Sequence, residues 1–409
     1  MTDTGLTSAN IVVIGAGAVG IAIAWQLAER GVSDVAVVEK SAITHGSTWH
    51  AAGLVGQFRT REDLARLMRS SVVLIEEIQR DTPIDWRQVG SVRIASSPER
   101  WFELVHGAGQ AKRYGVDYRL IDAKEAQRLF PLLDTAGISG AAWVPGDGYV
   151  DPSSLTMAMA ARARKKGVRI IEGVTVTGFA HDGGTITSVQ HARGEIRCST
   201  VVLAAGVWAR ALGRTLGLDL PVASLEHQYA VTETHASVPR DLPALRDPDL
   251  NFYLKPDVGA LAIGGWETET PAVYDNIMPA SFGRSLLPSN LDRISPLLEA
   301  AARRIPLLGE VGLKTIVNGP IPVTPDGEPI LGPAPGFANL HLAIGFTSGI
   351  AASAGAGRAV AEWIADGQPS FTLPSLAPAR FDMQMGDAEL QAAAQRAYAT
   401  YYALSRHAA

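Results

Sequence analysis

The fold of this chain is decided by residues 11–20, IVVIGAGAVG. Four β-prone apolar residues come first, and the glycines at 15, 17 and 20 then form a G-x-G-x-x-G turn that leads into helical spacing up to Gly31. A second apolar strand, VAVV at residues 35–38, closes with Glu39. Residues 11–39 therefore predict one βαβ unit of about 30 residues, and this unit predicts a parallel sheet.

The glycine turn also predicts a ligand. Glycines at these positions permit the tight turn, let the backbone approach a pyrophosphate and pack the helix against the strand. Glu39 follows Gly15 by 39 − 15 = 24 residues, where a carboxylate accepts hydrogen bonds from ribose hydroxyls. A turn that binds nothing is the alternative, and the motif alone does not decide between NAD and FAD. The predicted dinucleotide-binding residues here are Gly15, Gly17, Ala18, Val19, Gly20, Glu39 and Lys40.

Length and composition narrow the class of protein. At about 150 residues per domain, 409 residues suggest two or three domains, and 47% hydrophobic residues are enough for buried cores. The formal charge is −5 and no basic run is dense enough to follow a phosphate backbone, which argues against a nucleic-acid partner. Cys198 is the only cysteine, so an intrachain disulfide or a zinc site made of cysteines alone is excluded, and no metal site is predicted.

One apolar run resembles a membrane or export signal. Residues 11–25 are apolar or glycine throughout, but a spanning helix needs about 20 such residues. Residues 1–10 contain no Lys or Arg, which a signal peptide would carry before its apolar core. We therefore expect no membrane association and a cytoplasmic protein.

The pattern along the chain predicts an α/β fold with two domains. A discontinuous Rossmann-like, dinucleotide-binding domain is expected from residues 1–85, 145–222 and 318–370. An α+β substrate-binding domain with a mainly antiparallel sheet is expected from residues 86–144 and 223–317, followed by a C-terminal helical tail at 371–409. We expect helices at 63–79, 122–130, 153–166, 289–304, 345–365 and 387–405, and strands at 86–96, 167–179, 200–208, 228–234, 252–255, 261–263 and 340–344. Asp387 is the expected N-cap of the last helix, which we expect to pack on the body or on a partner.

Residues 44–54, THGSTWHAAGL, follow the ribose-binding strand and on such a fold run along the pyrophosphate toward the redox ring. Here the chain resembles the flavoprotein domain of the sarcosine and dimethylglycine dehydrogenase family, within the D-amino-acid oxidase superfamily. Further matches follow in family order at residues 146–152, 226–229, 318–320, 324–327 and 343–346. The resemblance implies FAD, held covalently through His50, which matches the family's flavin-bearing histidine. A hydrogen-bonded structural histidine is the alternative.

The resemblance also implies the remaining cofactor residues. Val174 matches the strand that touches the adenine, Ala205 and Gly206 match a turn beside the flavin phosphates, and residues 345–350 begin a helix whose free N–H groups face the flavin. A buried strand with no ligand is the alternative for the first two. The full set is Ser47, Thr48, His50, Ala52, Gly53, Leu54, Val174, Ala205, Gly206, Trp208, Gly345, Phe346, Thr347, Ser348, Gly349 and Ile350.

His227 and Tyr253 are the catalytic candidates on the substrate side, because each lies on an expected strand of the second domain and matches a position that faces the flavin. Tyr253 is expected to hydrogen-bond the substrate carboxylate or amine, and His227 to keep the amine unprotonated. A satisfied strand histidine and a half-buried strand aromatic are the alternatives. The cation that binds the carboxylate stays open among Arg59, Lys255, Arg284 and Lys314.

The implied function is an FAD-dependent amine oxidase or dehydrogenase acting on a secondary or tertiary amine, an N-methyl amino acid or betaine-derived amine. Hydride passes to flavin N5, and hydrolysis of the iminium completes oxidative N-demethylation. No second G-x-G-x-x-G unit is present, so electrons are expected to enter from the organic substrate.

Two alternatives remain. One is an oxidase of the glycine or proline type. The other is the flavin subunit of a hetero-oligomeric amine dehydrogenase, with an electron-acceptor protein or a folate-binding subunit as partner, because the family's folate-binding half is not matched here. The substrate, the electron acceptor and the oligomeric state stay open.

Overall fold

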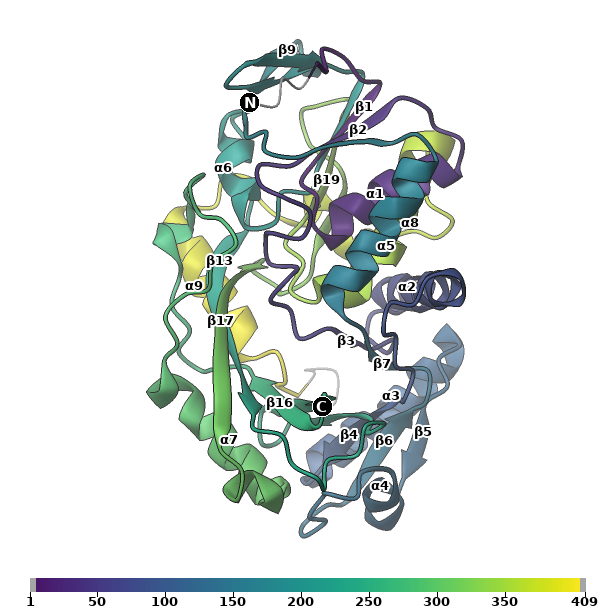
Figure 1. Cartoon of the computed structure of the whole chain (residues 1–409), viewed down its shortest axis with the longest axis vertical. Helices are drawn as coiled ribbons and strands as arrows, with labels where there is room; N and C mark the ends of the chain where they lie inside the picture. The colour runs from purple at the N-terminus through teal and green to yellow at the C-terminus, as the bar shows by residue number, and fades with distance from the viewer. Residues whose placement is uncertain (1–4, 405–409) are drawn as a thin grey trace.

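The computed structural model describes residues 5–404 and contains, in the upper part of Figure 1, the predicted parallel sheet. Its strand order is β18-β19-β12-β1-β2-β8, and every neighbouring pair is parallel except β18 with β19. The strands are β1 (Ile11–Ile14), β2 (Val35–Val38), β8 (Arg169–Ile171), β12 (Thr200–Leu203), β18 (Ile330–Pro333) and β19 (Leu340–Ile344). The βαβ prediction for residues 11–39 is confirmed.

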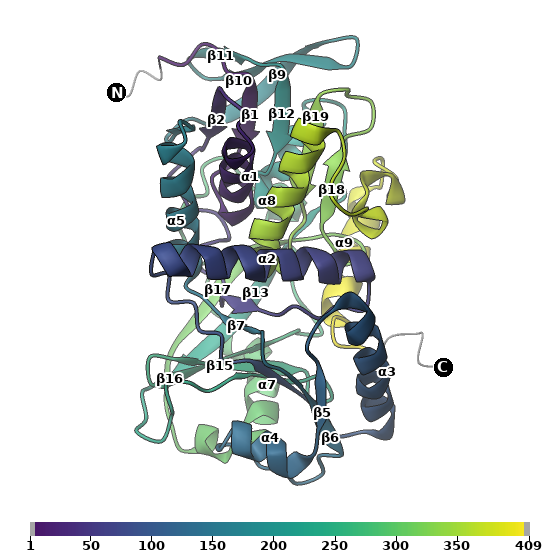
Figure 2. The same cartoon turned by 90° about the vertical axis from the view of Figure 1, so that its right-hand side faces the viewer.

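Helices cover one face of this sheet. Figure 2 shows α1, α5 and α8 side by side, with α2 crossing below them. These helices are α1 (Ala18–Glu29), α2 (Glu62–Asp81), α5 (Pro152–Lys165) and α8 (Gly349–Asp366). The contact between α1 and α8 is close because Gly357 meets Ala22, and a Cβ atom at 357 would lie 2.6 Å from the Ala22 carbonyl carbon.

A small antiparallel sheet lies at the end of the parallel sheet (Figure 1). It contains β9 (Val176–Asp182), β10 (Thr185–His191) and β11 (Gly194–Arg197). The single strand expected at 167–179 is wrong, because β8 and β9 belong to different sheets and residues 172–175 turn between them. Alternating apolar residues continue through that turn, so their pattern does not reveal the break.

The lower part of the molecule in Figure 1 is built on an eight-stranded sheet of order β17-β13-β16-β15-β14-β4-β6-β5. All neighbours are antiparallel except β14 with β4. The strands are β4 (Ser91–Ala95), β5 (Arg119–Ile121), β6 (Gly140–Val144), β13 (Ala223–Thr232), β14 (Ala244–Asp247), β15 (Phe252–Asp257), β16 (Ala260–Gly265) and β17 (Leu313–Val323). The predicted second sheet is therefore present and mainly antiparallel.

The other elements connect or cover these sheets. Strands β3 (Leu54–Val55) and β7 (Gly148–Tyr149) pair with each other. The remaining helices are α3 (Pro98–Tyr114), α4 (Ala123–Leu129), α6 (Ala209–Arg214), α7 (Leu291–Arg304) and α9 (Asp387–Ala399). Short 3₁₀ turns occupy Gly206–Trp208, Tyr274–Asn276, Pro306–Gly309, Pro374–Leu376 and Pro378–Arg380.

Helix α3 is an element that the sequence pattern missed. Gly107 and Gly109 in its interior reduce helix propensity and hide the pattern. Its terminal signals are nevertheless present: the Ser97 hydroxyl caps the backbone N–H of Arg100, Pro98 is the first helical residue, and Gly115 ends the helix in the left-handed conformation.

The last helix begins at Asp387 and ends at Ala399, earlier than the expected residue 405, which lies outside the described residues. The predicted N-cap was wrong, because Gly386 holds that position. Asp387 instead accepts hydrogen bonds from Arg210 and Arg214, each at 2.7 Å. These ion pairs attach α9 to α6.

The predicted domain division stays a prediction. Its strand segments do group as expected into the two large sheets, but the border between residues 317 and 318 falls inside β17. Across residues 5–404, no helix combines the length and the apolar character needed to cross a bilayer.

Candidate active site

One cavity of about 1610 Å³ extends from the parallel sheet to the eight-stranded sheet. This volume exceeds the roughly 300–1,000 Å³ of an ordinary small-molecule pocket. All the predicted cofactor-binding and catalytic residues line it except Gly20. His227 and Tyr253 therefore share one continuous space with the glycine turn, although the elements that carry them belong to different sheets.

The glycine turn lets the chain pack closely at the start of α1. A Cβ atom at Gly15 would lie 2.5 Å from the carbonyl oxygen of Ala204, and a Cβ atom at Gly17 would lie 3.2 Å from Thr48 Oγ1. Thr48 Oγ1 accepts a hydrogen bond of 3.1 Å from the backbone N–H of Ala18. Gly17, Ala18 and Val19 at this helix start line the cavity, and the N-terminus of a helix suits a pyrophosphate.

Gly20, the third glycine of the turn, does not line the cavity. A Cβ atom there would lie 2.0 Å from the carbonyl oxygen of Gly15. This third glycine therefore lets the first turn of α1 pack on the strand–helix turn, which is the packing role expected for a glycine of this motif.

Glu39 is fixed at the end of β2. Its Oε2 accepts from the backbone N–H of Ala16 and its Oε1 from that of Ser41, both at 2.8 Å. Burial raises the pKa of this carboxyl group, and the two N–H donors oppose that rise. Each carboxylate oxygen has a second lone pair, so Glu39 can still accept hydrogen bonds from ribose hydroxyls.

Lys40 and Val174 complete this end of the cavity. The Lys40 ammonium lies 4.2 Å from the centre of the Trp208 ring and donates to the carbonyl oxygen of Phe282. Val174 lies between β8 and β9 and not in a strand, which corrects the expectation, and its N–H donates to the carbonyl oxygen of Glu39 at 2.9 Å. Both residues still line the cavity.

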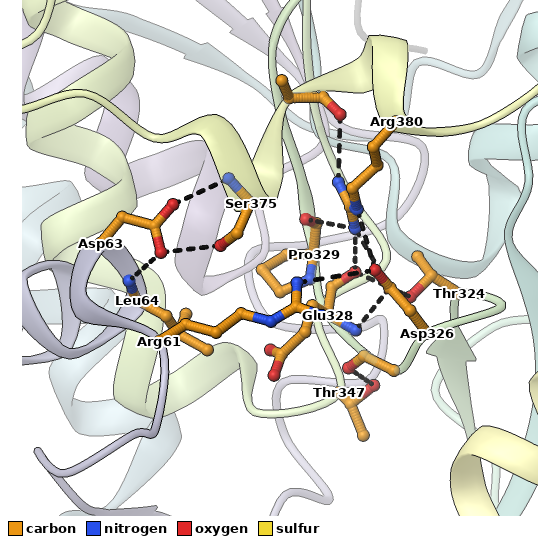
Figure 3. A network of polar contacts seen from close by, with 12 residues as sticks. Arg61, Asp63, Leu64, Thr324, Asp326, Glu328, Pro329, Thr347, Ser375 and Arg380 are labelled. Atoms are coloured by element: carbon orange, nitrogen blue, oxygen red, sulfur yellow. Dashed lines mark hydrogen bonds and ion pairs between the residues drawn. The ribbon is translucent and has the colours of Figure 1, made fainter. Parts of the chain in front are cut away.

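Residues 325–328 line the cavity, and the network in Figure 3 holds the segment that contains them. Asp326 accepts from Arg380 Nε at 2.9 Å and from the backbone N–H of Glu328 at 3.0 Å. Thr347 Oγ1 donates to the carbonyl oxygen of Gly327 at 3.2 Å. The Thr-Pro-Asp-Gly motif thereby fixes the loop that precedes α8. That helix starts at Gly349, four residues after Gly345 turns with a φ of +73°.

His50 faces the cavity as a neutral ring. Burial lowers its pKa to about 4. Among the described residues its Nε2 has no hydrogen-bond partner. A Cβ atom at Gly319 would lie 2.4 Å from His50 Cε1, so the Asn-Gly-Pro motif leaves room for this ring.

The Glu-His-Gln-Tyr motif lies on β13, and its alternation separates two faces of the strand. His227 and Tyr229 line the cavity. Glu226 lies on the opposite face and pairs with Arg293 at 2.7 Å, and Gln228 donates to Glu267 at 2.7 Å. Arg293 also pairs with Glu267 at 3.0 Å, which closes a buried network behind His227.

His227 is held between two tyrosines. Its Nε2 lies 2.9 Å from Tyr253 Oη and its Nδ1 lies 2.7 Å from Tyr398 Oη. Burial lowers the pKa of His227 to about 4, with smaller effects in the same direction from His50 and Arg293. Burial also raises the pKa of Tyr253 well above its ordinary value. All three side chains are therefore neutral around pH 7.

The C-terminal segment contributes an aromatic wall that sequence reasoning missed. Tyr401 stacks on Trp266 with ring centres 3.9 Å apart, and its hydroxyl lies 3.1 Å from Ser348 Oγ. Tyr402 also lines the cavity. The tyrosine-rich composition of residues 398–402 is the signal that could have found this wall, because such a cluster is rarely left in solvent.

The four cationic side chains predicted as possible partners of a substrate carboxylate differ in how well they are placed to bind it. Arg59 lines the cavity but donates to the carbonyl oxygen of Phe58 at 2.8 Å. Lys255 pairs with Asp257 at 3.2 Å. Lys255, Arg284 and Lys314 are absent from the cavity lining formed by the described residues, and Arg284 lies over the Trp49 ring.

Arg246, which was not predicted, is the better-placed cation. It lines the cavity and is the register partner of Tyr253 across β14 and β15. Within residues 5–404 no carboxylate oxygen lies within 4.0 Å of its guanidinium. Burial raises the pKa of the nearby Asp147 carboxyl group, and the charge of Arg246 opposes that rise. Arg93 also lines the cavity but lies 3.8 Å from Glu103. Because β14 has only four residues, the sequence pattern did not predict it.

The residues of this site fit a dinucleotide that carries a redox ring. A glycine turn lies at a helix start, and the Glu39 carboxylate is fixed at the end of the second strand. One long cavity connects them with the neutral side chains of His227 and Tyr253. This combination is typical of dinucleotide-dependent oxidoreductases. Residues 10–363 match the family described as FAD dependent oxidoreductase, and the chain belongs to that family.

Relatives agree with this assignment. The chain is 37% identical over 400 residues to dimethylglycine dehydrogenase, mitochondrial, from Rattus norvegicus. The alignment covers 95% of this chain and 47% of that relative. It is 32% identical to sarcosine dehydrogenase, mitochondrial, from Homo sapiens, over 93% of this chain and 42% of the relative. The chain thus spans about half the length of these curated relatives. The resemblance stated from the motifs is confirmed.

Solved structures confirm the fold class. L-proline dehydrogenase from P. horikoshii superposes with a TM-score of 0.84 at 27% identity, covering 92% of this chain and 98% of that chain. Glycine oxidase from Geobacillus kaustophilus superposes with a TM-score of 0.77 at 25% identity, covering 92% and 100%.

Proposed function

We propose that this chain oxidises the C–N bond of a secondary or tertiary amine that carries a carboxylate, such as an N-methyl amino acid. One observation supports the proposal most strongly. The residues expected to hold the dinucleotide, the hydrogen-bonded His227–Tyr253 pair and Arg246 all line the same cavity. The names of the dimethylglycine and sarcosine dehydrogenase relatives support this substrate class. When bound, FAD supplies the acceptor for the hydride that leaves the carbon next to nitrogen.

The residues at the substrate end act on binding and protonation. Arg246 binds the carboxylate through a charge-assisted hydrogen bond. Because His227 and Tyr253 are neutral, they provide no negative charge that would stabilise an ammonium group, so the amine binds with its lone pair free. After hydride loss, water adds to the iminium carbon, and the products are an aldehyde, the demethylated amine and one proton.

We also propose that His50 forms the covalent link to FAD. Its ring is neutral, borders the cavity and has an Nε2 without a hydrogen-bond partner among the described residues, so a nitrogen lone pair is available. Acid precipitation of the purified protein tests this: a yellow pellet with a clear supernatant is expected for the natural chain. His50→Ala should move the yellow colour to the supernatant. A yellow supernatant from the natural chain contradicts the link.

The activity is tested by steady-state turnover of the holoenzyme with an artificial electron acceptor. N-methyl amino acids should release formaldehyde in proportion to the electrons accepted. The structural similarity to glycine oxidase and L-proline dehydrogenase favours a second candidate, an oxidase of glycine or proline. Glyoxylate or a cyclic imine as product, without formaldehyde, would decide for that second candidate.

The cytoplasmic location and the partner subunits remain proposals. Native mass measurement of the protein purified from its source tests the partner: an active single chain contradicts the requirement for a folate-binding or electron-acceptor subunit. Co-purification of a second chain that is needed for turnover supports it.

A further inference from the structure

Both ring nitrogens of His227 are occupied by tyrosine hydroxyls that come from opposite sides. Tyr253 on β15 lies 2.9 Å from Nε2, and Tyr398 on α9 lies 2.7 Å from Nδ1. Helix α9 lies beside β13, which carries His227 (Figure 1). Tyr398 is 1% exposed, so water does not compete for its hydroxyl group.

A neutral imidazole has one N–H donor and one lone pair. One tyrosine must therefore donate to His227 while the other accepts from it. Two arrangements satisfy this rule. In the first, Tyr398 donates to Nδ1 and Nε2–H donates to Tyr253. In the second, all these hydrogen bonds run in the opposite direction.

The surroundings of Tyr398 select the first arrangement. Tyr398 does not line the cavity, and the only hydrogen-bond partner of its hydroxyl among the described residues is His227. Burial also raises the pKa of this hydroxyl well above its ordinary value. In the second arrangement this oxygen would accept from His227, and its own buried hydrogen would have no acceptor among the described residues. In the first arrangement the hydrogen left over belongs to Tyr253, which lines the cavity. A buried donor without a partner destabilises the folded chain. Donation from Tyr398 to His227 avoids that cost.

We propose that Tyr398 is a positioning residue that sets His227 in its Nε2–H tautomer and so makes Tyr253 a hydrogen-bond donor toward the cavity. In this arrangement Tyr398 donates to His227, His227 donates to Tyr253, and the hydroxyl hydrogen of Tyr253 is left to donate into the cavity. Arg246, the register partner of Tyr253, adds a charged donor beside it. This pair matches a carboxylate, so the inference rests on the proposed function and assigns its carboxylate contacts to Tyr253 and Arg246.

The tautomer is measured without any substrate. Nitrogen-15 spectra of the holoenzyme labelled at histidine distinguish a protonated ring nitrogen from an unprotonated one, and the His227 signals are those lost in His227→Gln. The Nε2–H form is expected in the natural chain, with a shift toward a mixture in Tyr398→Phe. An Nδ1–H form in the natural chain, or the same tautomer in Tyr398→Phe, overturns the proposal.

Kinetics tests the consequence for the substrate. Tyr398→Phe should raise KM for an N-methyl amino acid about tenfold with little change in kcat, and should leave KM unchanged for a matched methylamine without a carboxylate. Tyr114→Phe removes a buried hydroxyl outside the cavity and is the control. An equal effect on both amines overturns the carboxylate role. If the natural chain oxidises no amine, the proposed function fails, and the nitrogen spectra still decide the tautomer.

Discussion

At the scale of single residues, Arg246 tests the substrate side most simply. Arg246→Gln keeps a polar side chain but removes the charge that faces the cavity. A hydrogen bond to a charged group contributes about 1.5–3 kcal/mol, so kcat/KM for an N-methyl amino acid should fall roughly 10- to 100-fold. Most of the loss should appear in KM, measured under saturating electron acceptor.

Lys255→Gln is the matched control for this substitution. Lys255 lies on the neighbouring strand β15, pairs with Asp257 and is outside the cavity lining of the described residues. Its removal should change kcat/KM less than twofold. A large loss in Lys255→Gln together with a small one in Arg246→Gln would reverse the assignment.

At the scale of elements, the start of α1 depends on Gly20. Gly20→Ala places a Cβ atom 2.0 Å from the carbonyl oxygen of Gly15, so the helix must move away from the strand–helix turn. Overpacking of this kind costs about 1–3 kcal/mol, and the shifted turn should also lower the flavin content. Urea unfolding and the visible absorbance of the purified protein measure both effects.

Gly109→Ala is the control at the same scale. Gly109 lies inside α3, is exposed, and a Cβ atom there meets no heavy atom within 4 Å. This substitution should stabilise the protein by about 0.5–1 kcal/mol, because alanine loses less conformational freedom in a helix. Equal destabilisation by both substitutions would contradict the packing role of Gly20.

The elements also show what the sequence could predict. The βαβ unit depends on local pattern, and the fold follows it. The strand expected at 228–234 is also present, but β13 begins earlier, at Ala223. Helix α3 and strand β14 were missed because glycines weaken the first pattern and the second is too short to show one. The N-cap role of Asp387 failed for another reason: a long-range ion pair with Arg210 decides its position.

At the scale of the whole molecule, the cavity joins segments that lie far apart in the sequence. The glycine turn near residue 15, the strand at 227 and the tyrosines near 400 meet only after the two large sheets and α9 assemble. No local sequence pattern indicates that these distant segments contact the same cavity. For this reason, the cofactor end could be predicted from motifs, whereas Arg246 and the C-terminal wall could not.

Assembly of the cavity also buries His227 among Tyr253, Tyr398 and Trp266, with His50 and Arg293 close enough to lower its pKa. Its pKa of about 4 in the folded chain lies below the 6.5 of an unfolded histidine. The unfolded chain therefore binds the extra proton first, and stability falls as pH decreases from 6.5 toward 4. Between pH 7 and 5 this histidine should reduce the free energy of unfolding by about 2 kcal/mol.

Urea unfolding at pH 7 and pH 5 measures this loss. His227→Gln should lose about 2 kcal/mol less than the natural chain over the same interval. His106→Gln is the control, because His106 is exposed on α3 in the folded chain as well. Equal losses in the natural chain and in His227→Gln would show that His227 is not buried as a neutral ring.

The most direct test of the central claim is the visible spectrum of the purified holoenzyme before and after anaerobic addition of N,N-dimethylglycine and related N-methyl amino acids. Amine oxidation predicts that at least one of them bleaches the flavin bands and that formaldehyde forms in equal amount to the flavin reduced. If the flavin stays oxidised with every secondary and tertiary amine of this class, while dithionite bleaches it, the proposed function is wrong.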